Sequence, residues 1–167
     1  MKALRFYDVQ DLRYEDAPDP VIEKPDDVIV KVKAVGICGS DIARYRNLGP
    51  YVPRNVWGHE FCGEVVEVGE GVKNLKPGDR VVGCPNMVCH ECEYCKSGHP
   101  SRCENLNTIG AYVPGAYAEY IKLPEINFVK MADSMSYEQG ALVEPATVAI
   151  HGLYQTSIKM GYEVAVG

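Results

Sequence analysis

The sequence lacks a long apolar run, an excess of positive charge and any internal repeat. No apolar stretch approaches the roughly 20 residues that a membrane-spanning helix needs. Lys and Arg number 17 against 23 Asp and Glu, and the net charge of −6 argues against a nucleic-acid or anionic-membrane partner. The N-terminus also lacks the basic stretch and apolar run of a secretory leader. We therefore expect a cytoplasmic protein without a nucleic-acid or membrane partner.

Cysteine, in contrast, is abundant: the 167 residues include seven. Four of them follow the spacing C-x2-C-x2-C-x7-C, at Cys89, Cys92, Cys95 and Cys103. Four thiolates at such intervals can enclose one tetrahedral Zn2+ and leave no open coordination position. The pattern predicts a structural zinc site in a lobe over residues 84–106. The alternatives are free thiols or two disulfides, which the spacing and a reducing compartment disfavour.

The first two-thirds of the chain has the pattern of short strands separated by glycine and proline. Residues 28–35, VIVKVKAV, place apolar side chains at 28, 30, 32 and 34 on one face, with Lys31 and Lys33 on the other. Further strands are predicted at residues 2–9, 61–68, 80–82, 116–123 and 127–130. In the turns at 69–71 and 76–79, glycine is expected to supply positive φ. This alternation favours an antiparallel barrel or sandwich.

Helical patterns begin at Ser136. Ser136 can cap a helix whose first turn holds Glu138 and Gln139. Apolar clusters at 141–143, 148–150 and 153–154 predict helices packed on the barrel, with Pro145 interrupting or restarting them. Residues 163–167, EVAVG, predict a buried strand that runs into a glycine.

A second group of candidate metal ligands combines four side chains from distant segments: Cys38, His59, Glu60 and Glu144. One Cys, one His and one or two carboxylates can hold Zn2+ and leave a position for water or substrate. Spacing alone does not show that they meet. Taken singly, His59 also fits a surface or core histidine, Glu144 a helix-end carboxylate, and Cys38 a buried small residue.

The stretch G-H-E-x-x-G-x5-G-x-x-V at residues 58–72 resembles the signature of the zinc-containing medium-chain dehydrogenases, the alcohol and polyol dehydrogenase family. The C-G-S-D box at 38–41, the four-cysteine lobe, the K-P-G-D turn at 76–79 and G-A-Y-A-E-Y at 115–120 follow in that family's order. The resemblance covers residues 1–167. Glu144-Pro145 resembles the branch of sorbitol, threonine and galactitol-phosphate dehydrogenases.

The resemblance implies a mainly β fold with short helices: a GroES-like, partly open β-barrel catalytic domain over residues 1–155. Residues 156–167 then correspond to a linker and the first strand of a Rossmann cofactor domain. The chain contains no G-x-G-x-x-G motif, so no cofactor-binding residue is assigned. We expect the chain to be a truncated portion of a longer dehydrogenase and to be inactive alone.

The resemblance also implies two Zn2+ per chain, one structural and one catalytic. Cys38 and His59 match the first two ligands of the catalytic zinc, and Glu60 matches the third. Glu144 matches a carboxylate that binds directly or through water. Ser40 matches the hydroxyl that carries the alcohol proton away.

Residues next to these ligands also have counterparts in the family, or depart from its pattern. Asp41 matches a residue that orients a ligand or the following helix, although a simple helix-start acceptor explains it equally well. Many relatives complete a proton relay with histidine where this chain has Ala43. Arg44 matches a position that lines the substrate pocket and could bind a phosphate or polyol oxygen; a solvated helix arginine is the alternative. Cys62 and Cys84 match no ligand and are interpreted as packing residues.

The implied activity is hydride transfer from a zinc-bound secondary alcohol or polyol, with a sugar-alcohol phosphate as one candidate, to NAD or NADP. The full-length enzyme is expected to be a homodimer or homotetramer. A different class is a stand-alone zinc-binding GroES-like module that acts in protein interactions. A third, redox or zinc storage by the cysteine lobe, leaves Cys38, His59 and Glu144 without a role. A reading frame that continues past Gly167 into G-x-G would favour the enzyme.

Overall fold

The computed structural model describes residues 1–159 and 161–165. Its largest sheet has five antiparallel strands in the order β10-β6-β5-β3-β9. These strands are β3 (Asp27–Val35), β5 (Phe61–Val68), β6 (Arg80–Gly83), β9 (Tyr120–Pro124) and β10 (Phe128–Lys130). A second sheet has the order β2-β1-β4, from β1 (Lys2–Asp8), β2 (Asp11–Asp16) and β4 (Asn55–Val56). The strands β7 (Asn86–Met87) and β8 (Asn107–Thr108) form a third, small sheet.

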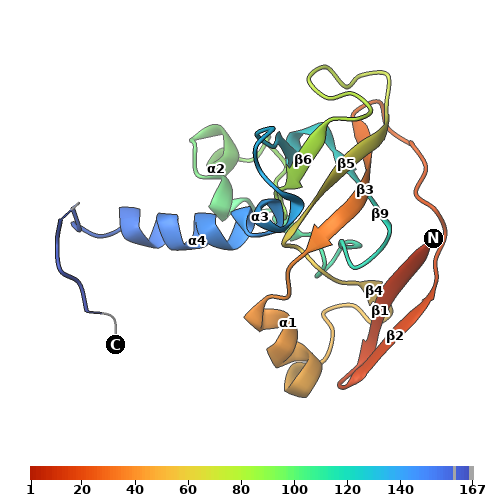
Figure 1. Cartoon of the computed structure of the whole chain (residues 1–167), viewed down its shortest axis with the longest axis horizontal. Coiled ribbons are helices and arrows are strands. Elements are labelled where there is room, and N and C mark those ends of the chain that lie inside the picture. The colour runs from red at the N-terminus through yellow and green to blue at the C-terminus, as the bar shows by residue number, and fades with distance from the viewer. Residues whose placement is uncertain (160, 166–167) are drawn as a thin grey trace.

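Residues 116–119 join the two larger sheets into one curled, open half-barrel (Figure 1). The Leu4 N–H donates to the Tyr117 carbonyl at 2.7 Å, and the Val32 N–H donates to the Glu119 carbonyl at 2.9 Å. This segment pairs with both β1 and β3, but its backbone bends at residues 116, 117 and 119, so the strand predicted at 116–123 begins only at Tyr120. The predicted mainly β, GroES-like class is confirmed, and β2 was not predicted.

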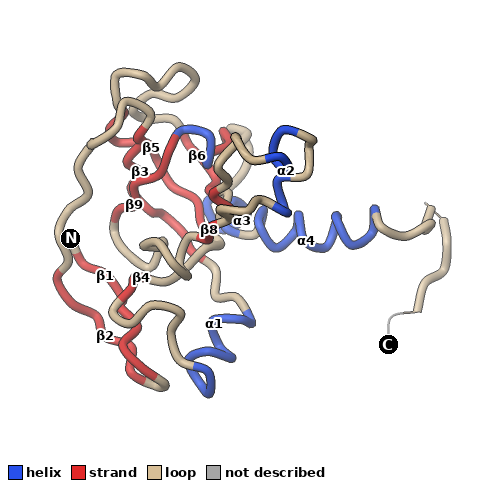
Figure 2. Tube along the Cα trace, turned by 180° about the vertical axis from the view of Figure 1, so that it is seen from behind, coloured by secondary structure: helices blue, strands red, loops and turns tan. Residues whose placement is uncertain are grey.

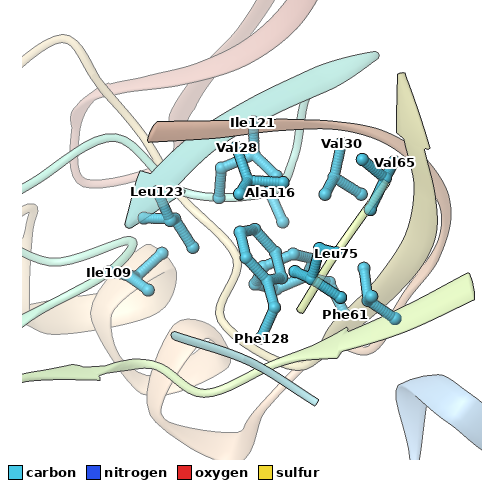
Figure 3. Close-up of a cluster of buried hydrophobic side chains, with 11 residues drawn as sticks. Val28, Val30, Phe61, Val65, Leu75, Ile109, Ala116, Ile121, Leu123 and Phe128 are labelled. Atoms are coloured by element: carbon cyan, nitrogen blue, oxygen red, sulfur yellow. The ribbon is translucent and has the colours of Figure 1, made fainter. Parts of the chain in front are cut away.

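The interior of the half-barrel is filled by apolar side chains from the five-stranded sheet and from loops beside it. Figure 3 shows them converging. The cluster comprises Val28, Val30, Phe61, Val65, Leu75, Val81, Ile109, Ala116, Ile121, Leu123 and Phe128. The rings of Phe61 and Phe128 pack edge to face, with centroids 6.3 Å apart. This continuous apolar interior holds the strands that carry the candidate ligands at their ends.

The predicted alternation along β3 holds only over its first half. Val28, Val30 and Val32 face the interior, as predicted. The pairing register with β5 then shifts between Val32 and Ala34. An extra residue in one strand turns the following side chains to the opposite face. Ala34 therefore packs outside the barrel, beside Cys62, while Val35 returns to the interior.

The helix α3 (Tyr137–Ala141) covers the outer face of β5 and β6. The predicted cap is confirmed: the Ser136 hydroxyl accepts from the Gln139 N–H at 3.2 Å, and the Gln139 side chain accepts from the Ser136 N–H at 2.9 Å. Cys62 is buried under α3, as predicted for a packing residue, and burial raises the pKa of its thiol. Cys84 is exposed instead, because it follows the end of β6 beyond the cover of α3.

The longest helix, α4 (Val143–Tyr154), packs on the barrel only at its start, through Val143, and the rest of it does not, contrary to the prediction. Both views show it extending away from the sheets (Figures 1 and 2). None of its residues is buried, and Val148 and Leu153 are 64% and 56% exposed. Pro145 lies in its first turn, where proline costs no helical hydrogen bond. Of the strand predicted at 163–167, residues 163–165 are not in a strand and 166–167 lie outside the described residues.

The remaining helices are short. They are α1 (Gly39–Ala43), α2 (Glu93–Lys96), the π-helix η1 (Arg44–Leu48), and the 3-10 turns η2 (Pro100–Arg102) and η3 (Glu125–Asn127). Among the helices of the described residues, none is both long and apolar enough to cross a bilayer. The turn at 76–79 has the expected positive φ at Gly78, +91°. The prediction is wrong for the turn at 69–71, because neither Gly69 nor Gly71 has a positive φ. Glycine is needed at position 69 for space instead, since a Cβ there would collide with the carbonyl oxygen of Pro25.

Candidate functional site

The four cysteines of the lobe form one compact cluster of sulfur atoms. Their Sγ atoms all lie within 4.8 Å of one another, with 3.5 Å between Cys103 and Cys89 and 4.0 Å between Cys89 and Cys95. All seven cysteines of the chain are free thiols, so the alternative of two disulfides does not hold. Tetrahedral sulfur ligands around Zn2+ at about 2.3 Å require sulfur separations close to these.

Backbone groups around this cluster favour thiolates. The N–H groups of Cys92 and Asn105 lie 3.3 Å from the Sγ atoms of Cys89 and Cys103. Hydrogen bonds from the N–H groups of Glu91 and Cys92 lower the pKa of Cys89 to about 6. Burial and, after it, hydrogen bonds with the neighbouring thiols together raise the pKa of Cys95 to about 12. Adjacent sulfurs cannot all carry negative charge unless a cation is bound among them.

The second cluster lies where β3 ends and β5 begins. Val35 pairs with Phe61 in the sheet, and just beyond this pair the Gly36 N–H donates to the Glu60 carbonyl at 2.7 Å. The two chain segments therefore leave the sheet side by side. As a result, Cys38, His59 and Glu60 each offer a ligand atom within 4.8 Å of the others. A thiolate, an imidazole and a carboxylate are all ligands that suit Zn2+.

Asp41 is buried beside this cluster and contacts both the start of α1 and His59. Its carboxylate accepts from the Cys38 N–H at 3.2 Å, as a helix-start acceptor does. It also accepts from the Tyr117 hydroxyl at 2.9 Å, and its Oδ1 lies 3.9 Å from His59 Nδ1. At 3.9 Å the contact with His59 is an electrostatic one, longer than a hydrogen bond, so the helix-start role is the one that a hydrogen bond supports.

Glu144 is near the cluster but is not one of the three residues whose ligand atoms converge. It is half-buried in the first turn of α4. Burial raises the pKa of its carboxyl group, the His59 charge opposes this effect, and the Glu60 charge adds to it. The charges of His59 and Glu60 therefore affect the pKa of Glu144, although Glu144 is not one of the converging ligands.

A pocket of 210 Å3 adjoins His59. Ser40, Asp41 and Arg44 line it. The rest of its lining comprises Tyr51, Trp57 and residues 108–112. Ser40 is exposed and so has access to solvent, as does Ala43.

Arg44 has a defined position in this pocket and is not a freely solvated helix residue. Its guanidinium carbon lies 3.2 Å from the centroid of the Tyr51 ring, and its Nη1 donates to the Gly49 carbonyl at 3.0 Å. Tyr51, Trp57 and Tyr117 were not predicted as site residues from the sequence. The G-A-Y-A-E-Y motif at 115–120 contains Tyr117 but carries no signal that its hydroxyl reaches Asp41.

Comparison with known proteins matches residues 24–133 to the alcohol dehydrogenase GroES-like domain. The chain is 39% identical to a sorbitol dehydrogenase of Bacillus subtilis strain 168, over 99% of this chain and 48% of that protein. The chain thus spans about half the length of this curated relative.

Two solved structures have the same fold. Galactitol-1-phosphate dehydrogenase from Escherichia coli has a TM-score of 0.89 at 35% identity, covering 92% of this chain and 44% of that one. A putative zinc-binding dehydrogenase from Sinorhizobium meliloti 1021, bound to NADP, has a TM-score of 0.84 at 38% identity, covering 96% and 46%. The match to the GroES-like domain, the half-barrel fold and these relatives together show that the chain belongs to the zinc-containing medium-chain alcohol and polyol dehydrogenase family.

Proposed function

We propose that this chain is the zinc-binding catalytic part of an NAD(P)-linked dehydrogenase that oxidises a secondary alcohol or polyol. The observation that carries the proposal is the convergence of Cys38, His59 and Glu60 beside a pocket that Ser40 and Arg44 line. Three ligands leave a fourth position on Zn2+ open to substrate, whereas the four-cysteine cluster leaves none. A protein-interaction module would not need three metal ligands that leave an open coordination position next to a pocket.

Each residue has a distinct task in this proposal. Cys38, His59 and Glu60 would hold the catalytic zinc, with Glu144 as a carboxylate that reaches it directly or through water. When bound, zinc supplies a Lewis acid that lowers the pKa of an alcohol hydroxyl. Ser40 accepts the hydroxyl proton and, being exposed, passes it to water. Water replaces the histidine relay, because Ala43 has no group that can carry a proton.

The nicotinamide cofactor would be NAD or NADP, and a relative of similar fold is bound to NADP. We propose residues 1–155 as the catalytic domain and assign cofactor binding to a longer protein, since the matched relatives are about twice the length of this chain. Hydride transfer requires the nicotinamide to be held about 3–3.5 Å from the alcohol carbon. The 167-residue chain alone should therefore give no turnover. A homodimer or homotetramer remains our expectation for the longer protein.

Arg44 supports a phosphorylated polyol as the substrate class. Its guanidinium lies in the pocket beside His59, and one of its N–H groups is used by the Gly49 carbonyl. The remaining N–H groups can bind a phosphate oxygen, for which the planar guanidinium is well suited. A relative of similar fold is a galactitol-1-phosphate dehydrogenase, whereas another relative is a sorbitol dehydrogenase.

The test is an assay of the longest protein that the gene encodes, with sorbitol and galactitol 1-phosphate as substrates and NAD+ and NADP+ as oxidants. We expect alcohol-dependent reduction of one cofactor, lost on removal of zinc and restored by adding it. His59→Ala should abolish turnover while the four-cysteine zinc stays bound. Full activity in zinc-free protein, or in His59→Ala, would exclude the proposed site.

A further inference from the structure

Tyr117 contacts both chain segments that supply the candidate zinc ligands. Its hydroxyl lies 2.9 Å from Asp41 Oδ2 and 3.1 Å from the Gly36 carbonyl oxygen, on the segment that leads to Cys38. Its ring packs on Gly58, the residue before His59. A Cβ at Gly58 would lie 2.6 Å from the nearest ring carbon.

The backbone of Tyr117 is also held in place. Its N–H donates to the Trp57 carbonyl at 2.6 Å, and its carbonyl accepts from the Leu4 N–H at 2.7 Å. The side chain therefore starts from a segment bonded to both sheets, and its reach toward Asp41 is defined by the fold. Gly58 has a φ of +94°, a conformation that glycine adopts without strain and that also leaves room for the ring.

We propose that Tyr117 is a positioning residue of the catalytic zinc site, and that it acts through Asp41 on His59 and Cys38. This inference rests on the proposed function. Asp41 is 9% exposed and needs donors for its carboxylate; Tyr117 and the Cys38 N–H supply them. The carboxylate then faces His59 Nδ1, which leaves Nε2 as the ring nitrogen available to zinc.

Removal of the hydroxyl deprives a buried carboxylate of one of its donors. Asp41 must then shift toward another partner or toward water, and its hold on His59 and on the start of α1 weakens. Groups that orient metal ligands typically change metal affinity by about 10–100-fold when removed. The four-cysteine cluster has no contact with Tyr117 among the hydrogen bonds of the described residues, so its affinity should not change.

Tyr117→Phe tests the proposal, with Tyr7→Phe as the matched control. The Tyr7 hydroxyl also donates to a carboxylate at 2.9 Å, that of Glu15, but this pair lies in β1 and β2. Zinc affinity of the 167-residue chain is measured by chelator competition, and Co2+ is then placed in the Cys38 site for absorption spectroscopy. We expect Tyr117→Phe to weaken this site about 10-fold and to shift the Co2+ bands. Tyr7→Phe should do neither.

A wild-type affinity and an unchanged Co2+ spectrum in Tyr117→Phe would overturn the inference. In an Asp41→Ala background, Tyr117→Phe should cause no further loss, and an independent loss would assign Tyr117 to packing alone. If Tyr117→Phe also empties the four-cysteine site, Asp41→Asn tests the same link between Asp41 and His59. Unchanged zinc affinity of the Cys38 site in Asp41→Asn would then refute the inference. If the wild-type chain holds one zinc that Cys38→Ser does not alter, the proposed function fails instead, which is a distinct result.

Discussion

The backbone N–H of Gly36 donates to the carbonyl of Glu60, and the Glu60 carboxylate lies against the α-carbon of Gly36. This contact joins the two segments that carry Cys38 and His59, immediately beyond the last paired residues of β3 and β5. A Cβ at position 36 would collide with Glu60 Oε2. The absence of a side chain at Gly36 is therefore a condition for the position of a candidate zinc ligand.

Gly36→Ala should displace the Glu60 carboxylate and empty the Cys38 site, while the four-cysteine site stays occupied. Zinc content after mild chelation measures this, with one zinc expected per variant chain. Gly39→Ala is the control, because a Cβ at Gly39 meets no atom within 4 Å. Equal zinc loss in both variants, or none in Gly36→Ala, would contradict the explanation.

The cysteine lobe should be structural. Cys92→Ser opens the thiolate cluster, and we expect loss of one zinc and of about 3 kcal/mol of stability, because structural zinc contributes folding free energy directly. In thermal unfolding this corresponds to a midpoint lowered by on the order of 10 °C. Cys84→Ser changes an exposed cysteine outside the cluster and serves as the control. An unchanged melting curve in Cys92→Ser would show that the lobe does not support the fold.

The role of Arg44 predicts a substrate-dependent effect in the longer protein. For a sugar-alcohol phosphate, Arg44→Ala should weaken kcat/KM by about 1.5–3 kcal/mol, the contribution of a charge-assisted hydrogen bond. For an uncharged polyol the effect should be small. Arg54→Ala is the paired control, since its guanidinium lies 5.5 Å from the Tyr7 ring and Arg54 does not line the pocket. Equal losses of kcat/KM on both substrates would show that Arg44 has a structural role, through its contacts with Tyr51 and Gly49.

Acid should destabilise the barrel partly through Asp79. The Asp79 carboxylate accepts from Lys130 Nζ at 2.9 Å and from the Lys76 N–H at 3.0 Å, and the bond to Lys130 holds its pKa below the usual range. A lowered pKa in the folded state stabilises the fold above the unfolded pKa of about 3.9. This contribution is lost as pH falls through the folded pKa.

Between pH 5 and pH 2, the wild type should therefore lose about 1 kcal/mol more stability than Asp79→Asn does. Urea unfolding across that range measures the difference. Asp133→Asn removes an exposed carboxylate nearby and should leave the wild-type slope in place. Parallel pH profiles for wild type and Asp79→Asn would show that the bond to Lys130 contributes nothing.

The sequence by itself determined the class of the fold and the identity of the candidate ligands. Strand periodicity, the Ser136 cap and the turn at Gly78 depend on neighbours within a few residues, so they could be predicted locally. The four cysteines could be predicted because their spacing is short enough for one loop to bring them together. Cys38, His59 and Glu60 could be predicted as a group only through the family resemblance, since the first two lie 21 positions apart.

The tertiary structure alone decided how these residues are held. Tyr117 and Asp41 are 76 residues apart, and their contact depends on the way residues 116–119 bridge two sheets. The bulge at Lys33 turns the Ala34 side chain to the opposite face of the sheet. The alternation of apolar and polar residues does not predict this change. The apolar residues of α4 predict burial, yet Val148, Ile150 and Leu153 are exposed in this chain. Periodicity reports which side chains are apolar, whereas register and the surfaces available for packing decide what those side chains contact.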